Sequence, residues 1–212
     1  MLQLDHVTVG AADLPQGTAY LRQQLGIDAP PGSQHADMGT HNHVLRVGDG
    51  VFLELLAIDP AGIRPRRARW FGMDDARQAR KLAERPRPVS WVLSTPDVAA
   101  AHAASRVDLG EILAMSRGAR SWRITVPESG MTAFDGCFPS LIQWSEGPPP
   151  ANAMAFLGPV LEQVILHHPH SEELRAALNE LGAGHLAEVK QSAEPHLAFS
   201  FRMPDGSSRV LT

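Results

Sequence analysis

The predicted strands and helices of this chain recur in the same order three times, and this recurrence constrains the fold more than any other feature. The first copy reads as a strand, a helix that Asp13 caps and Gly26 ends, and two strands joined by the turn signal GDG. The second copy begins at Val89 and the third at Val160. Repeated modules of this size bury their sheet faces against one another. We therefore expect an α+β fold built of tandem modules.

The boundaries of the modules follow from two stretches of different composition. The first module covers residues 1–59, and an Arg- and Pro-rich linker covers residues 60–88. The second module spans residues 89–146, and a linker containing GPPPANAM follows at residues 147–158. Residues 159–212 form a third, partial module.

Composition excludes several classes of protein. Hydrophobic residues make up 43% of the 212 residues and charged residues 20%, as in a globular chain. The net charge of −4 argues against nucleic-acid binding, which needs a basic surface. A single cysteine, Cys137, allows no intrachain disulfide and fits a reducing compartment. The N-terminus lacks the pattern of a signal peptide, and no apolar stretch has the length of a membrane span. We expect a cytoplasmic protein with no nucleic-acid or membrane partner.

A lone carboxylate stands in the apolar run VFLELLAI. This residue, Glu54, is costly to bury without a partner, a proton or a metal ion. His6 lies in another strand-like run, LQLDHVTV, so histidine and glutamate on neighbouring strands supply two ligands of the kind a divalent metal uses. The alternatives are a buried carboxylate satisfied by arginine or backbone donors, and a core histidine.

The segment HADMGTHNH is the second candidate for a functional site. It carries His35, His41 and His43, with Thr40 and Asn42 among them. Histidine serves as a ligand or as a general base at neutral pH. A tight turn joins this strand to the Glu54 strand, so we expect the segment to border the same cavity, with His35 or His41 as the third polar group. The alternative is an exposed loop.

Aromatic and arginine side chains are candidates for substrate contacts. The stretch IRPRRARW, which includes Arg69, is either a solvated linker or a clamp for an anionic substrate. Trp70 and Phe71 would then form an apolar edge, and Trp91 and Trp144 lie in the core or in the wall of a pocket.

Several fragments in this order resemble the glyoxalase-like domain family of the vicinal oxygen chelate superfamily. The fragments are LDHVTVGAADL, GSQHADMGTHNHVLRVGDG, FLELLAID, RWFGMD and FPSLIQW. The resemblance covers the first two modules. It implies βαβββ modules whose curved mixed sheets form a cup. It also assigns a characteristic role to the segment matched here by His35, Gly39, Thr40 and Asn42, as a wall facing the substrate.

The resemblance also implies a metal at the mouth of the cup. Each of two modules would give one ligand from its first strand and one from its last, which fall here on His6, Glu54, Trp91 and Gln143. Tryptophan cannot bind a metal, and glutamine is only a neutral donor. The implied ligands are therefore His6, Glu54 and Gln143, around a divalent ion (Zn, Mn, Fe, Ni or Mg). If the first module pairs with the third instead, Gln163 replaces Trp91.

Two functions are compatible with these residues. The first is a divalent-metal-dependent lyase, isomerase or dioxygenase acting on a substrate with vicinal oxygens, in which Glu54 or His35 moves a proton. Its substrate-binding residues would be His35, Thr40, His41, Asn42, His43, Trp91 and Arg69. The second is a metal-free module that binds a small ligand or confers resistance without catalysis. The expected partner is a small molecule, and a homodimer is a possible assembly.

Overall fold

The first module forms a four-stranded βαβββ unit, as the resemblance implies, with a strand in the segment before His35 that the residue pattern did not indicate. In the computed structural model, which describes all 212 residues, this unit contains one helix and four strands. They are β1 (Gln3–Gly10), α1 (Leu14–Leu25), β2 (Pro31–His35), β3 (Thr40–Arg46) and β4 (Phe52–Ile58). The Asp13 side chain accepts a hydrogen bond from Gln16 N at 2.7 Å, and Gly26 ends the helix in the left-handed conformation. Strand β4 lies between β3 and β1 and is parallel to β1.

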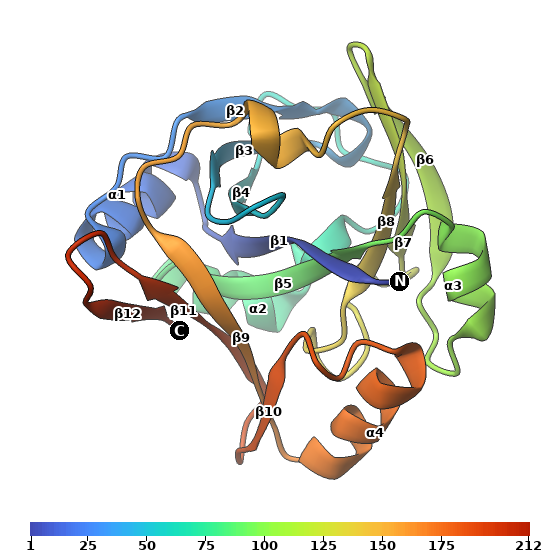
Figure 1. Cartoon of the computed structure of the whole chain (residues 1–212). Helices are drawn as coiled ribbons and strands as arrows, with labels where there is room; N and C mark the ends of the chain where they lie inside the picture. The colour runs from blue at the N-terminus through green and yellow to red at the C-terminus, as the bar shows by residue number, and fades with distance from the viewer.

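The second module repeats this topology and joins the first edge to edge. Its elements are β5 (Arg87–Ser94), α3 (Val98–Ala104), β6 (Glu111–Arg117), β7 (Arg120–Val126) and β8 (Ser140–Trp144). Strands β1 and β5 pair antiparallel, which gives one eight-stranded sheet in the order β2-β3-β4-β1-β5-β8-β7-β6. Figure 1 shows that this sheet curls into a cup. The first module therefore pairs with the second and not with the third.

The two predicted linkers contain regular structure that their composition did not indicate. The first holds a 3₁₀ turn (Trp70–Gly72) and α2 (Ala76–Glu84), whose start is capped by Asp75. The second holds a 3₁₀ helix (Pro150–Ala153) and runs back across the cup, where Arg46 N donates to Ala155 O at 2.9 Å. Both linkers therefore form part of the cup.

The third module contains the expected order of elements but a different strand order. Its elements are β9 (Val160–His168), α4 (Ser171–Leu181), β10 (Glu188–Gln191), β11 (His196–Arg202) and β12 (Ser208–Leu211). They form a separate sheet in the order β10-β9-β11-β12, in which β9 is parallel to β10 and antiparallel to β11. This strand order differs from that of the first two modules, in which the first strand pairs with the last strand of its own module. Local sequence patterns specify strands, whereas the choice of neighbour depends on long-range contacts.

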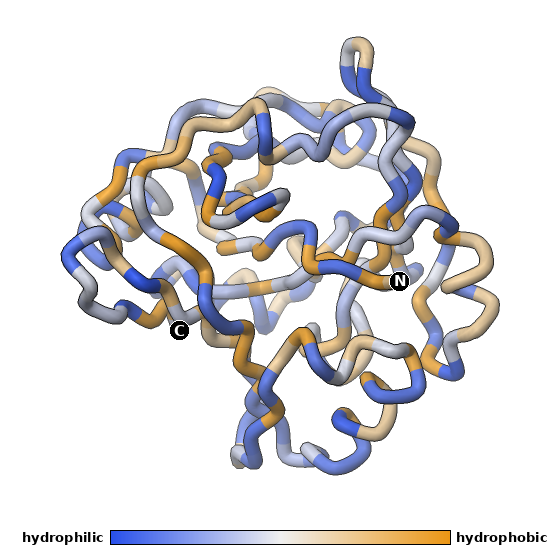
Figure 2. The backbone as a smooth tube through the Cα atoms, viewed as in Figure 1, coloured by the Kyte–Doolittle hydropathy of each residue, from blue (hydrophilic) through white to orange (hydrophobic).

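Alternation along the strands divides the molecule into two cores. On the outer face of the cup, Val7 and Val9 of β1 join Trp91, Phe199 and other side chains in a cluster of 29 buried residues between the two sheets. The inner face carries a second cluster of 13 buried residues. Figure 2 shows polar and apolar residues interspersed along the backbone. None of the helices combines the length and the apolar character needed to span a membrane.

Candidate active site

The inner face of the cup encloses a narrow cavity with a volume of about 50 Å³. Aromatic side chains make up much of its wall. Its charged or hydrogen-bonding residues, apart from the indole groups, are His6, His35, Asn42, Glu54 and Arg117. The parallel register pairs Thr8 of β1 with Glu54 of β4. This register explains why His6 and Glu54 lie on the same side of the sheet, because residues two apart in a strand share a face. The structure thus brings together His6, Glu54 and one end of the predicted histidine segment.

Glu54 is buried at this cavity with neutral partners only. Its side chain accepts a hydrogen bond from Asn42 Nδ2 at 2.7 Å and another from Thr8 Oγ1 at 3.1 Å. The residue is 5% exposed, and no arginine, lysine or histidine forms an ion pair with it within 4.0 Å. The structure therefore gives the Glu54 carboxylate neither an arginine nor a backbone donor as its partner. Two neutral donors orient the carboxylate and leave its charge facing the cavity.

His6 is oriented by a carboxylate of its own. Its Nδ1 lies 2.6 Å from Asp5 Oδ1, and the other oxygen of Asp5 accepts a hydrogen bond from Trp144 Nε1 at 2.8 Å. The imidazole stacks on Phe52, with the ring centres 4.4 Å apart. An irregularity in the β1–β5 register between Leu4 and His6 places the adjacent side chains together. The Asp5 contact fixes Nδ1 as the hydrogen-bonded nitrogen, so that Nε2 is the one available for other contacts.

His35 also lines the cavity, and burial keeps it neutral. Its Nδ1 lies 3.0 Å from Thr40 Oγ1 and its Nε2 lies 3.4 Å from Asn42 Nδ2. Burial lowers the pKa of His35 to about 4, although the nearby charge of Glu54 acts in the opposite direction. Because the Asn42 amide is a donor, Nε2 accepts and Nδ1 carries the proton that bonds Thr40. Asn42 thereby links His35 to Glu54.

The other two histidines of this segment lie on the opposite face of β3. Strand alternation directs Asn42 and Val44 to the cavity and His41 and His43 away from it. His43 Nδ1 lies 2.7 Å from Ala29 O, and the buried Nε2 of His41 has no hydrogen-bond partner. The structure therefore places His35 and Asn42 in the site, positions Thr40 behind His35, and removes His41 and His43 from the predicted substrate contacts.

Three further predicted residues, Arg69, Trp91 and Gln143, lie outside the cavity. Arg69 donates to Asp74 Oδ1 at 2.6 Å and to Gly39 O at 3.4 Å, so its guanidinium supports the turn that carries Trp70 and does not line the cavity. Trp91 is fully buried in the outer core.

Gln143 is directed away from the predicted ligands His6 and Glu54. Its neighbours Ile142 and Trp144 line the cavity, so alternation along β8 directs Gln143 to the other face. There its oxygen accepts hydrogen bonds from Val98 N at 3.0 Å and from Arg123 at 2.6 Å.

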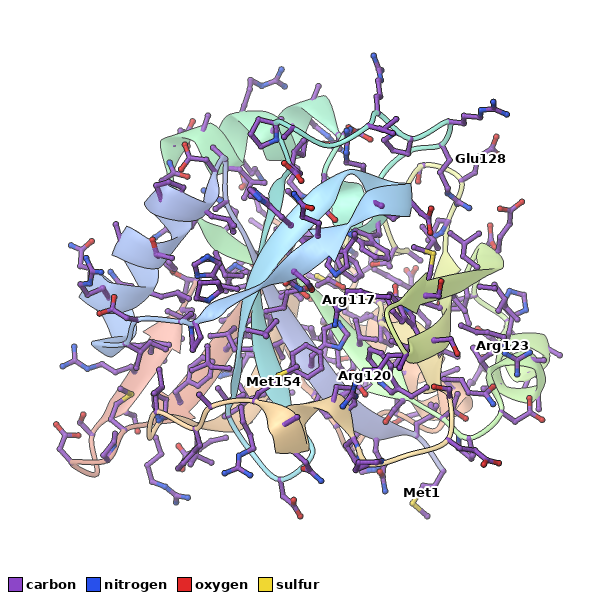
Figure 3. The ribbon with its side chains drawn as sticks, turned by 90° about the horizontal axis from the view of Figure 1, so that it is seen from above. Met1, Arg117, Arg120, Arg123, Glu128 and Met154 are labelled. Atoms are coloured by element: carbon purple, nitrogen blue, oxygen red, sulfur yellow. The ribbon has the colours of Figure 1, made fainter.

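Arg117 is the cavity residue that the sequence did not reveal. It ends β6, donates a hydrogen bond to Ser33 Oγ on β2, and lies over the ring of Trp122, with the guanidinium carbon 5.8 Å from the ring centre. Figure 3 places Arg117 and Met154 near the middle of the view from above and Arg123 at the periphery. Since β2 and β6 are the two edges of the sheet, this contact bridges the open side of the cup. Only tertiary structure brings Arg117 to Glu54, 63 positions away in sequence.

The donors at the cavity do not complete a metal site. A stable divalent site of this type has at least three protein ligands. His6 and Glu54 fit the chemistry, and the Asp5 contact is typical of metal-binding histidines. However, no group of three or more His, Cys, Asp or Glu side chains is arranged to hold an ion, and Glu54 already accepts two hydrogen bonds. From the second module, β8 contributes Ile142 and Trp144 to the cavity wall, and neither side chain is a metal ligand. The predicted divalent ion thus stays a prediction.

A curled sheet of two βαβββ modules around a cavity defines a glyoxalase/dioxygenase-like fold. The family model described as "Glyoxalase-like domain" matches residues 4–182, so the chain belongs to this family of the vicinal oxygen chelate superfamily. No curated protein matches the sequence.

Among solved structures, a hypothetical protein from Staphylococcus aureus aligns with a TM-score of 0.64 at 16% identity, covering 95% of this chain and 81% of that one. This likeness shows the fold. Methylmalonyl-CoA epimerase from Mycobacterium tuberculosis aligns with a TM-score of 0.42 at 20% identity, covering 71% of this chain and 91% of that one. The same enzyme from Streptomyces coelicolor gives 0.41 at 18% identity, covering 66% and 96%.

Proposed function

We propose that the chain is a small-molecule isomerase or lyase in which Glu54 moves a proton on a substrate with adjacent oxygens. The observation that carries the proposal is the state of Glu54. It is a buried carboxylate at the cavity, oriented by Asn42 and Thr8 and paired with no cation. A carboxylate with this orientation can take a proton from a carbon next to a carbonyl group, which is general-base catalysis.

The neighbouring side chains have complementary roles in this proposal. His6, held by Asp5, directs Nε2 to a substrate oxygen and accepts or returns a proton there. His35 is a positioning residue, because its neutral ring holds the Asn42 amide that orients Glu54. The aromatic walls exclude water and thereby strengthen the electrostatic interactions of the reacting groups.

Solvent-deuterium exchange tests this proposal without knowledge of the substrate. Hydroxyacetone, dihydroxyacetone and pyruvate are incubated in D₂O with the protein, and loss of the carbon-bound proton is followed by NMR. The wild type should accelerate exchange of at least one probe, and Glu54→Gln should reduce the rate by about 10²–10⁴-fold, the usual contribution of a general base. Glu128→Gln is the matched control, since Glu128 is exposed and lies at the periphery in Figure 3. Equal rates in wild type and Glu54→Gln contradict the proposal.

A metal-free binding module is the second candidate. It is favoured by the small cavity and by the hydrogen bonds that both carboxylate oxygens of Glu54 already accept. Under this hypothesis the protein exchanges none of the probes but binds small ligands, and Glu54→Gln changes affinity alone.

A divalent-metal-dependent lyase, isomerase or dioxygenase would use His6 and Glu54 as its metal ligands. Metal analysis of protein purified without a polyhistidine tag tests it, together with titration of Zn²⁺ and Mn²⁺ into the wild type and into Glu54→Gln. Removing the only anionic ligand should weaken ion binding at least tenfold, which corresponds to about 1.4 kcal/mol.

A further inference from the structure

We propose that Arg117 makes this cavity selective for small anions, specifically for a planar carboxylate attached to a flat apolar body. The inference takes from the proposed function only the identity of the cavity as the ligand site. It adds a specificity-determining residue and a substrate class.

The first argument is the shortage of partners around Arg117. It is the only lysine or arginine in the cavity wall, and its one hydrogen bond goes to the hydroxyl of Ser33. A guanidinium carries five N–H donors in a planar fork, so most of its donors find no acceptor in the protein. That fork matches both oxygens of a carboxylate at once.

The second argument is electrostatic. Arg117 is half-buried, so its charge is partly removed from water, and this burial lowers the pKa of its guanidinium. The charge of Glu54 acts in the opposite direction, but the two side chains form no ion pair. Instead Glu54 of β4 accepts hydrogen bonds from Thr8 and Asn42, while Arg117 of β6 donates a hydrogen bond to Ser33. An anion beside Arg117 would supply the partner that the fold withholds.

The third argument concerns the rest of the ligand. Phe52, Trp70 and Trp122 are 4–6% exposed and line the same cavity, and Trp122 lies beneath the guanidinium. Flat aromatic surfaces favour a flat apolar body, which stacks against them. The narrow space limits that body to a small molecule.

The cavity also holds both charges that a proton-transfer site for an anion needs, Arg117 and Glu54, without an ion pair between them. With its carboxylate on Arg117 of β6, a ligand shares the cavity with Glu54 of β4. Arg117 then neutralises the negative charge of the substrate, which Glu54 would otherwise repel.

Benzoate and benzamide provide the test, because they share a planar ring and differ in charge. Dissociation constants are measured by titration into ¹⁵N-labelled protein, with backbone amide resonances as the readout of both binding and folding. The wild type should bind benzoate at least tenfold more tightly than benzamide. Arg117→Gln should bring the ratio close to one, and Arg117→Lys should give an intermediate ratio because it keeps the charge but loses the fork.

Two variants make the result specific. Arg123→Gln removes the same charge from the neighbouring strand, where Arg123 contacts Gln143 outside the cavity, and should keep the wild-type ratio. Glu54→Gln should keep or increase the preference for benzoate. The proposal is overturned if wild type binds neither probe or both equally, if Arg117→Gln leaves the ratio unchanged, or if Arg123→Gln lowers it equally.

The outcome is separable from that of the proposed catalysis. Selective benzoate binding without deuterium exchange supports the anion site and contradicts the enzyme. Exchange that depends on Glu54, combined with equal affinity for both probes, supports the enzyme and contradicts the role of Arg117.

Discussion

Replacing His35 by glutamine should make the protein less sensitive to mild acid. His35 has a pKa of about 4 in the folded chain, against an ordinary value of 6.5, because burial disfavours its charged form. The unfolded chain therefore takes up a proton at this residue first as the pH falls. Stability from neutral His35 is present above pH 6.5 and is lost progressively as the pH falls towards 4.

The size of the effect follows from the two pKa values. Their difference corresponds to about 3 kcal/mol in total, and about 2 kcal/mol of this is lost between pH 7 and pH 5. Glutamine does not titrate, so His35→Gln removes this component. The variant also loses the hydrogen bond to Thr40 and the contact with Asn42, which should cost about 1–3 kcal/mol at every pH.

Urea unfolding at pH 7 and pH 5 measures both effects. The informative quantity is the difference between the two pH values, compared between wild type and His35→Gln, because contributions of the other histidines cancel. His185→Gln is the control, since His185 is exposed to solvent and should leave the wild-type loss unchanged. If wild type and His35→Gln lose the same free energy of unfolding between the two pH values, His35 is not buried as a neutral base.

Three further predictions concern residues away from the cavity. Trp91→Ala should lower the free energy of unfolding by about 3–5 kcal/mol in urea, because it empties a fully buried site and leaves Cys137 O without its partner at 2.9 Å; an unchanged midpoint would place Trp91 outside the core. Burial raises the pKa of Cys137 to about 12, so the native thiol should not react with Ellman's reagent at pH 8 and should react after unfolding; a rapid native reaction would contradict its burial. Gly130→Ala should destabilise the chain on thermal unfolding, since φ is +78° there and a Cβ would lie 1.9 Å from Arg69 O; an unchanged Tm would contradict this close approach.

Much of the fold could be predicted from local sequence. Strand-like apolar runs located β1 and β4, and the capping residues Asp13 and Gly26 set the ends of α1. The alternation of side chains along β3 was not used in this way: His41, Asn42 and His43 were all predicted to contact substrate, and of these three Asn42 lines the cavity. The sequence also predicted that His6 and Glu54 lie at one cavity, because both positions follow from the βαβββ pattern and the resemblance built on it.

The composition of the linkers was a poorer guide. The stretch with four arginines was interpreted as a linker or a clamp, yet Arg69 is committed to Asp74 and Gly39. Its role depends on two acceptors, of which Asp74 is five residues away and Gly39 lies in a distant turn. Similarly, Gln143 lies one position away from the cavity-facing residues of β8, and an error of one residue in a strand reverses the face.

What the sequence by itself determined is therefore most of the strands and helices outside the linkers, the tandem βαβββ pattern, and the prediction that His6, Glu54 and His35 share one site. Tertiary structure alone decided which modules pair, how β9 to β12 are ordered, and that Arg117 and Asp5 complete the site. The physical reason is range. Alternation and capping act over a few residues, whereas Arg117 meets Ser33 only because the curled sheet brings its two edges together.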